Sequence, residues 1–82
     1  MDMDLKVFID SLKVEFEKEE KENVAADVVF RDLDSWNSMM ALIIIAKIDN
    51  DFDVTLSADE LAGSKTFKDL YKLVCLKKTK VN

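Results

Sequence analysis

The stretch SMMALIIIAKI, residues 38–48, decides the fold, because it contains the longest apolar run of the chain and has to be covered. Its periodicity alone does not separate a helix from a strand, and three consecutive isoleucines favour a strand locally. Its length and its Met, Ala and Leu residues favour a helix. No second strand-like run exists to pair with it, and a lone strand leaves its backbone hydrogen bonds unmade. The sequence therefore predicts a helix over residues 38–50 that is apolar on nearly every side.

Three further helices are predicted around this stretch. Residues 4–22 predict one amphipathic helix, with apolar positions at steps of three and four: Leu5, Phe8, Ile9, Leu12 and Phe16. Ser57 and Glu60 form a capping-box pattern for a short helix that ends at Gly63, and Thr66 caps a last helix. Residues 23–37 lose the periodicity but keep apolar side chains, which predicts a long loop across the core. We therefore expect an all-α fold in one domain, residues 1–82: a small four-helix bundle, three main helices plus one short helix, with a long loop between helices 1 and 2.

The composition excludes several classes of function. The 82 residues include 12 Lys+Arg and 17 Asp+Glu, and this net charge of −5 disfavours nucleic acid as a partner. Because the chain has no His, it has no Ser-His-Asp or Cys-His nucleophile and no imidazole metal ligand, so we expect no enzyme, no catalytic residue and no metal. The apolar run is too short to span a bilayer and Cys75 has no partner for a disulfide, so we expect a cytoplasmic protein, a monomer, with no membrane association.

An acidic segment after the central helix offers one alternative function. Its side-chain oxygens have the spacing of a calcium loop of the EF-hand type, through Asp49, Asp51, Asp53, Ser57 and Glu60. Val54 stands where that loop needs a glycine with positive φ, and Gly63 follows too soon for an exit helix. We therefore treat a calcium binder as the least favoured of three hypotheses.

A second pattern surrounds two serines before the apolar run, and with it the chain resembles the acyl carrier protein family. That family carries Asp-Ser-Leu at the start of its second helix, which is similar to Asp34-Ser35-Trp36 in spelling and to Asn37-Ser38-Met39 in spacing. Fourteen positions separate Ser38 from Phe52, as in the family, whereas Ser35 would insert three residues into the helix. The order of the other landmarks is also similar over roughly residues 5–75: Phe30-Arg31-Asp32-Leu33, Phe52-Asp53-Val54 and Lys65-Thr66-Phe67.

The resemblance implies a carrier whose reactive group belongs to a cofactor. It implies that Ser38, with Ser35 as runner-up, carries a covalent 4′-phosphopantetheine arm, which a phosphopantetheinyl transferase attaches from coenzyme A. The arm would hold acyl chains as thioesters for acyl-processing enzymes in fatty acid, polyketide or related biosynthesis. A cleft for the acyl chain is expected to be lined by Leu42, Ile45, Leu56 and Leu61. Partner docking is expected through Asn37, Met39, Met40, Ile43, Ala46, Asp49 and Asp51.

Two departures from the family pattern qualify these expectations. Asn37 stands where the family has Asp, so it still caps a helix but lacks a carboxylate for the transferase. The central helix also lacks the family's usual glutamates, which predicts that docking depends more on apolar contacts than on charge. An unmodified helical adaptor that binds a partner through the Met39–Ala46 stretch therefore remains the second hypothesis.

Overall fold

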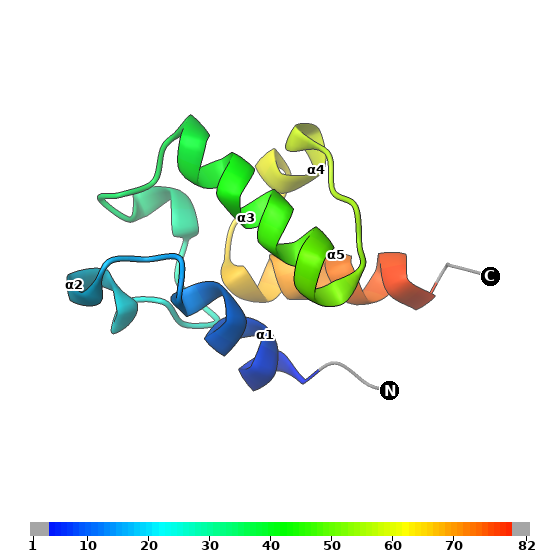
Figure 1. Cartoon of the computed structure of the whole chain (residues 1–82), viewed down its shortest axis with the longest axis horizontal. Helices are drawn as coiled ribbons and strands as arrows, with labels where there is room; N and C mark the ends of the chain where they lie inside the picture. Colours follow the sequence, from blue (N-terminus) through cyan, green and yellow to red (C-terminus); the bar gives the residue numbers. More distant parts are fainter. Residues whose placement is uncertain (1–3, 80–82) are drawn as a thin grey trace.

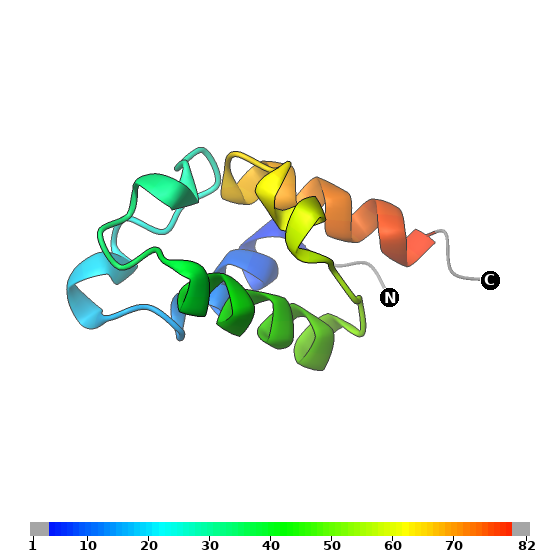
Figure 2. The same ribbon diagram turned by 90° about the horizontal axis from the view of Figure 1, so that it is seen from above.

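The computed structural model describes residues 4–79, and the outermost three residues at each end of the expected 1–82 domain lie outside this part. Its elements are α1 (Leu5–Lys13), α2 (Lys18–Lys21), the 3-10 turn η1 (Phe30–Asp32), α3 (Ser38–Phe52), α4 (Ala58–Ala62) and α5 (Phe67–Thr79). Figure 1 shows α3 crossing in front of α5, with α1 below them and α4 beside α3, and Figure 2 shows the same arrangement from above. The predicted small all-α bundle with three long helices is confirmed, and the described residues contain a second short helix, α2, besides the expected one, α4.

The core lies where α1 packs against both α3 and α5. Its fully buried side chains include residues from all three helices, among them Phe8, Leu12, Ile44, Ile48, Leu70 and Val74. Burying a side chain of this size contributes about 1.5–3 kcal/mol. The three long helices are therefore held together by one shared apolar interior.

The central helix α3 confirms the choice of helix over strand for the apolar run. Its buried residues, Met40, Ile44 and Ile48, recur at every fourth position, so only one face of the helix enters the core. Asn37 caps its N-terminus by accepting a hydrogen bond from the amide of Met40 at 2.8 Å. At the C-terminal end, Asp53 adopts the left-handed conformation with φ 59°, which Asp tolerates better than most residues.

The prediction of one continuous helix over residues 4–22 is wrong. The first helix ends at Lys13, and only the four residues of α2 are helical before the loop. The apolar stripe stops at Phe16, and residues 17–23 contain no apolar side chain, so nothing would bury a further two turns. Consistently, α2 has no buried residue. The chain instead turns back and buries Val24, which is only 2% exposed.

The long loop between α1 and α3 lies across the core, as expected. Phe30 and Leu33 are buried, and the ring of Phe30 lies 4.8 Å from Trp36 and 5.5 Å from Phe67 between centroids. Backbone hydrogen bonds join this loop to the start of α5, from Phe67 N to Val28 O at 3.2 Å and from Phe30 N to Lys65 O at 3.3 Å. The loop that leads into α3 is therefore anchored.

The short helix α4 has the predicted capping box. Ser57 accepts from the amide of Glu60 at 3.1 Å, and the Glu60 carboxylate accepts from the amide of Ser57 at 2.9 Å. Lys77 on α5 pairs with the same carboxylate at 2.7 Å, and its hydrogen bond holds the pKa of Glu60 below the ordinary value. Within residues 4–79, no helix is long and apolar enough to cross a membrane.

Candidate functional site

Ser38 is the first residue of α3 and lies on the surface. Its neighbour Asn37 already provides the helix cap, so the Ser38 hydroxyl is not needed for capping. Among residues 4–79, this hydroxyl has no hydrogen-bond partner. The amides of Ser38 and Met39 belong to the first turn, which has no acceptor within the helix. A negatively charged group attached to Ser38 would therefore meet free N–H groups and the positive end of the helix dipole.

Ser35, three residues earlier, lies in a different environment. It occupies a turn before α3 and is half-buried. Its hydroxyl donates to the carboxylate of Glu20 in α2, and its amide donates to the same carboxylate at 3.3 Å. Ser35 is thus used to fasten the loop to α2, whereas Ser38 is left uncommitted at a helix end.

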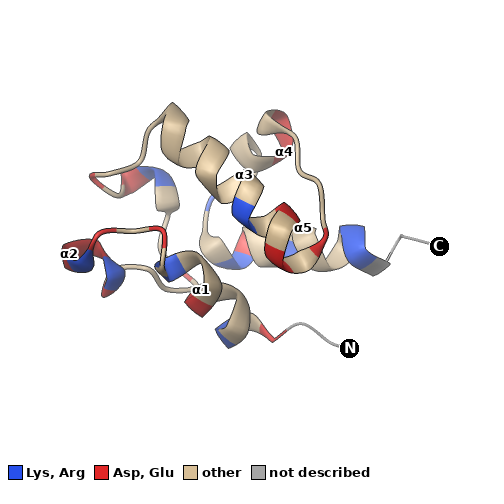
Figure 3. Ribbon diagram, in the orientation of Figure 1, with Lys and Arg blue, Asp and Glu red and all other residues tan. Residues whose placement is uncertain are grey.

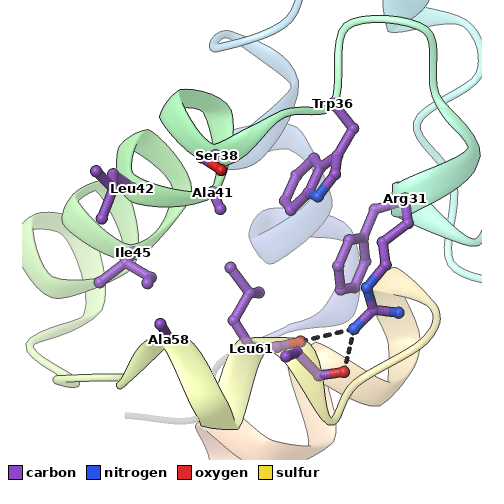
Figure 4. A pocket seen from close by; sticks show the side chains of 10 residues that line it. Arg31, Trp36, Ser38, Ala41, Leu42, Ile45, Ala58 and Leu61 are labelled. Carbon is purple, nitrogen blue, oxygen red and sulfur yellow. Dashed lines mark hydrogen bonds between the residues drawn. The ribbon is translucent and has the colours of Figure 1, made fainter.

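An apolar cavity of about 280 Å³ adjoins Ser38 (Figure 4). Its first wall comes from α3 and its second from α4, and the long loop provides the third. The lining residues are Ser38, Ala41, Leu42 and Ile45 from α3, Ala58, Leu61 and Ala62 from α4, and Phe30, Arg31 and Trp36 from the loop. The cavity is partly open to solvent, since Leu42 on its wall is 64% exposed.

The structure places three of the four residues expected at the cleft, Leu42, Ile45 and Leu61, on the wall of this cavity. Leu56 is different, because it is 4% exposed, belongs to the core and does not line the cavity. Leu56 lies in the extended link before α4. An apolar residue at this position of the sequence is compatible both with the core and with the cavity wall, so the sequence did not separate the two.

The sequence did not identify the loop wall of the cavity. Phe30 and Arg31 belong to a motif that was recognised, and Trp36 precedes the helix cap, but nothing in their spacing shows which side chains turn toward α4. Ala58 and Ala62 weakly indicated the α4 wall of the cavity. Small residues four positions apart lie on the same face of a helix and leave space beside that face.

The surface of α3 next to Ser38 is apolar. We define the α3 apolar face as Met39, Leu42, Ile43 and Ala46, all of which are exposed. Figure 3 shows that the first half of α3 carries no charged residue. The expectation that Met40 belongs to this surface is wrong, because Met40 is 7% exposed and points into the core.

Charged residues are confined to the C-terminal half of α3. Asp49 is exposed, whereas Asp51 accepts a hydrogen bond from Ser11 on α1 and pairs with Lys47 at 3.1 Å. Lys47 also lies 3.8 Å from Glu15. The hydrogen bond from Ser11, followed by that from Lys47, holds the pKa of Asp51 below its ordinary value. Asp51 is therefore committed to joining α1 and α3, and Asp49 is the freer acidic group.

The calcium alternative has no geometric support in the described residues. No cluster of three or more His, Cys, Asp or Glu side chains within residues 4–79 could hold a metal ion. The acidic residues of that segment instead make the ion pair of Asp51 and the capping box of Glu60.

A small helical bundle that exposes an uncommitted serine at a long helix N-terminus, beside an apolar cavity, has the features of a carrier domain for a covalent arm. The family described as phosphopantetheine attachment site matches residues 7–74. The chain therefore belongs to this family and is an acyl carrier protein-type domain that bears covalent 4′-phosphopantetheine. No curated protein and no solved structure matches the chain.

The residues around Ser38 fit such an arm. The exposed hydroxyl supplies an attachment oxygen, the first turn of α3 supplies unpaired amides, and the apolar cavity lies directly beside them. Carrier domains of this family are typically non-catalytic, and they interact with acyl-processing enzymes and with the carried acyl groups. When bound, the arm supplies a thiol that holds the acyl group as a thioester.

Proposed function

We propose that this protein carries acyl intermediates on a 4′-phosphopantetheine arm attached to Ser38 and delivers them to successive biosynthetic enzymes. The observation that carries the proposal is the contrast between the free, exposed hydroxyl of Ser38 and the hydroxyl of Ser35, which donates to Glu20. In the attachment step, the Ser38 Oγ bonds to the β-phosphorus of coenzyme A. The phosphoanhydride bond breaks, the nucleotide leaves, and the hydroxyl proton passes to a base of the transferase.

The first turn of α3 supports this attachment electrostatically. The phosphodiester formed at Ser38 carries a negative charge next to the amides of Ser38 and Met39. A helix N-terminus favours such a charge, typically by about 0.3–1 kcal/mol at an exposed position. Asn37 keeps these amides in place through its cap on Met40 and adds no charge of its own.

The cavity is the proposed shelter for the acyl chain. Its walls are apolar apart from Arg31 and the Ser38 hydroxyl, so methylene groups can leave water there without burying unpaired polar groups. A cavity of about 280 Å³ is just below the range of small-molecule sites, roughly 300–1,000 Å³, so it suits a short chain.

The α3 apolar face is the proposed docking surface for the transferase and the acyl-processing enzymes. It borders Ser38, so an enzyme bound there has its active site close to the arm. Met39 at 70% exposure and Leu42 at 64% are the most exposed large apolar side chains of the face. Exposed apolar side chains that cluster in this way commonly mark an interaction site. Asp49 adds a minor electrostatic contribution.

The test is the intact mass of the protein after incubation with coenzyme A and a transferase of broad specificity. We expect the wild-type chain and Ser35→Ala to gain the mass of one arm, and Ser38→Ala to gain none. Peptide mapping of the loaded protein should place the adduct on Ser38. An adduct at Ser35, or loading of Ser38→Ala, would contradict the proposal.

The same experiment decides the second candidate function. The exposed apolar residues of α3 would also serve an adaptor that binds a partner without any modification. An adaptor gains no mass with any transferase although its fold is intact, which circular dichroism of the same sample establishes.

A further inference from the structure

The short helix α4 forms one wall of the cavity, yet it has little packing of its own. It has five residues, of which only Leu61 is buried. Two cations from other elements contact it. Lys77 on α5 pairs with Glu60, and Arg31 on η1 donates from Nη2 to the carbonyl oxygens of Leu61, at 3.3 Å, and Ala62. The position of this wall therefore depends on contacts made from outside α4.

Arg31 differs from Lys77 because it lines the cavity itself. It is the only charged residue among the lining residues. Its guanidinium carbon lies 5.1 Å from the centroid of the Phe30 ring, and it forms no ion pair with another residue of the described part. Figure 4 shows the guanidinium reaching from the loop to the end of α4, on the side of the cavity away from Leu42 and Ile45. One side of the cavity is thus lined by a hydrogen-bonded charged group that also reaches solvent.

We propose that Arg31 determines acyl-chain length, by closing one end of the cavity so that only short acyl groups are fully sheltered. This inference rests on the proposed carrier function. A chain that enters from Ser38 between α3 and α4 meets apolar side chains until it reaches Phe30 and Leu61. To go further it must displace the guanidinium from the two carbonyl oxygens.

The physical reason is the cost of that displacement. Moving Arg31 breaks its hydrogen bonds to the carbonyl oxygens of Leu61 and Ala62, which a charged donor makes stronger than neutral ones. The Leu61 oxygen keeps its bond from the Ser64 amide and the Ala62 oxygen is exposed, so the cost is the loss of these charge-assisted bonds. Methylene groups packed against the guanidinium would also strip water from its charge. The gain from burying additional methylene groups is offset at this point, so a longer chain whose end has reached Arg31 leaves its thioester in solvent.

The test measures thioester hydrolysis on the loaded protein with acyl groups from butanoyl to dodecanoyl. Four forms are compared: wild type, Arg31→Ala, Arg31→Lys and Lys77→Ala. Only the unsheltered population reacts, so a chain that is sheltered about nine-tenths of the time hydrolyses about tenfold more slowly than a free pantetheine thioester. In the wild-type protein we expect this protection for the short acyl groups and its loss for the long ones.

Arg31→Ala should extend the protection to longer acyl groups, and Arg31→Lys should largely restore the wild-type limit because an ammonium can donate to the same carbonyl oxygens. Lys77→Ala is the matched control. This substitution removes the ion pair of Lys77 with Glu60 on α4, and Lys77 does not line the cavity. We therefore expect a lower melting temperature and an unchanged limit on acyl-chain length.

Two results would overturn the inference while leaving the proposed function intact. Either the loaded Arg31→Ala protein keeps the wild-type limit, or Lys77→Ala shifts the limit as much as Arg31→Ala does, which would indicate a general loosening of α4. If Arg31→Ala does not fold, Arg31→Met, which keeps an aliphatic side chain and has no hydrogen-bond donor, takes its place with the same expectation. A wild-type chain that accepts no arm fails at the earlier step, and the proposed function falls together with the inference.

Discussion

The two ends of α3 are built for different purposes. The N-terminal end has an uncommitted serine, no charged residue, exposed apolar side chains and a cavity beside it. The C-terminal end has a fully buried Ile48, and two of its charged residues contact α1: Asp51 accepts from Ser11, and Lys47 pairs with Glu15. We call the C-terminal end of α3, which contacts α1, the fastened end, and the N-terminal end, whose serine and apolar side chains are exposed, the open end. From this comparison we expect contacts with α1 to stabilise the C-terminal end of α3, and the exposed apolar side chains of the N-terminal end to contribute little to stability.

The largest effect should come from the fastened end. Ile48→Ala removes a fully buried side chain from the contact of α3 with the other helices, so we expect a loss of about 2–5 kcal/mol in the free energy of unfolding. Met39→Ala, at the open end, should change it by less than about 0.5 kcal/mol. Urea denaturation followed by circular dichroism measures both values. Similar losses for the two variants would remove the contrast between the ends.

The second effect concerns the binding of partner enzymes. Here a substitution at the open end should have a larger effect than one at the fastened end. Ile43→Glu places a charge on the α3 apolar face, and we expect enzyme binding to weaken by about 1–2 kcal/mol, as for a moderate interface hot spot. Asp49→Lys reverses an exposed charge and should cost less than about 1 kcal/mol. The Kd for the transferase, or the kcat/KM for acylation, gives the comparison.

Salt provides the control for this docking prediction. Screening by salt weakens contacts between exposed charges much more than apolar contacts. The wild-type Kd should therefore change little as the ionic strength rises. Equal acylation kinetics for wild type, Ile43→Glu and Asp49→Lys would show that enzymes dock elsewhere. Reversal of Asp51 is a poorer probe, since it also breaks the contacts with Ser11 and Lys47.

The third effect is the loss of the helix cap beside the attachment site. Asn37→Ala removes the acceptor for the Met40 amide, and we expect a loss of about 1 kcal/mol in unfolding free energy. Asn37→Asp keeps the cap and restores the carboxylate typical of the family, so it should be loaded with the arm faster than the wild-type chain. A time course of intact mass measures the loading, and a slower rate for Asn37→Asp would contradict this role of the carboxylate.

The smallest effect is the pH dependence of the ion pair at the fastened end. The pKa of Asp51 is lowered in the folded state, so its contribution to stability is present above the unfolded pKa, near the ordinary value of 3.8. That contribution disappears as the pH falls through the folded pKa. Because Asp51 is exposed, Asp51→Asn should cost about 0.2–1 kcal/mol at neutral pH.

Acid titration of the wild-type protein and Asp51→Asn isolates this contribution. The difference between their unfolding free energies should shrink as the pH falls through and below the range of the two pKa values of Asp51. A difference that stays constant down to strongly acidic pH would show that the Asp51 carboxylate does not act through its charge.

Much of the fold could be predicted from local sequence signals. The cap at Asn37, the capping box of Ser57 and the apolar spacing of Phe8, Ile9 and Leu12 each act within one or two helical turns. The end of the first helix was not predicted because the charged residues 17–22 are compatible with a helix. The helix is shorter because these residues have no apolar side chain to pack against the core. Met40 was assigned to the wrong face because the apolar run has no polar residue to mark its exposed side.

The candidate site was likewise predicted only in part from the sequence. Resemblance and spacing pointed to Ser38, but left Ser35 as an alternative. The difference between the two serines depends on Glu20, fifteen residues before Ser35, and on the return of the chain through α2 that brings this carboxylate there. Likewise, Leu42, Ile45 and Leu61 were expected at a cleft, whereas the contribution of Arg31 depends on its reach across to α4.

The sequence by itself determined the helical class, the position of the central helix, its cap and the family landmarks, because periodicity and capping are short-range properties of the chain. Only the tertiary structure decided which serine is free, which apolar residues of α3 remain exposed and what closes the cavity. These properties depend on contacts between residues that are far apart in the sequence. Such contacts follow from how all the helices together cover one core.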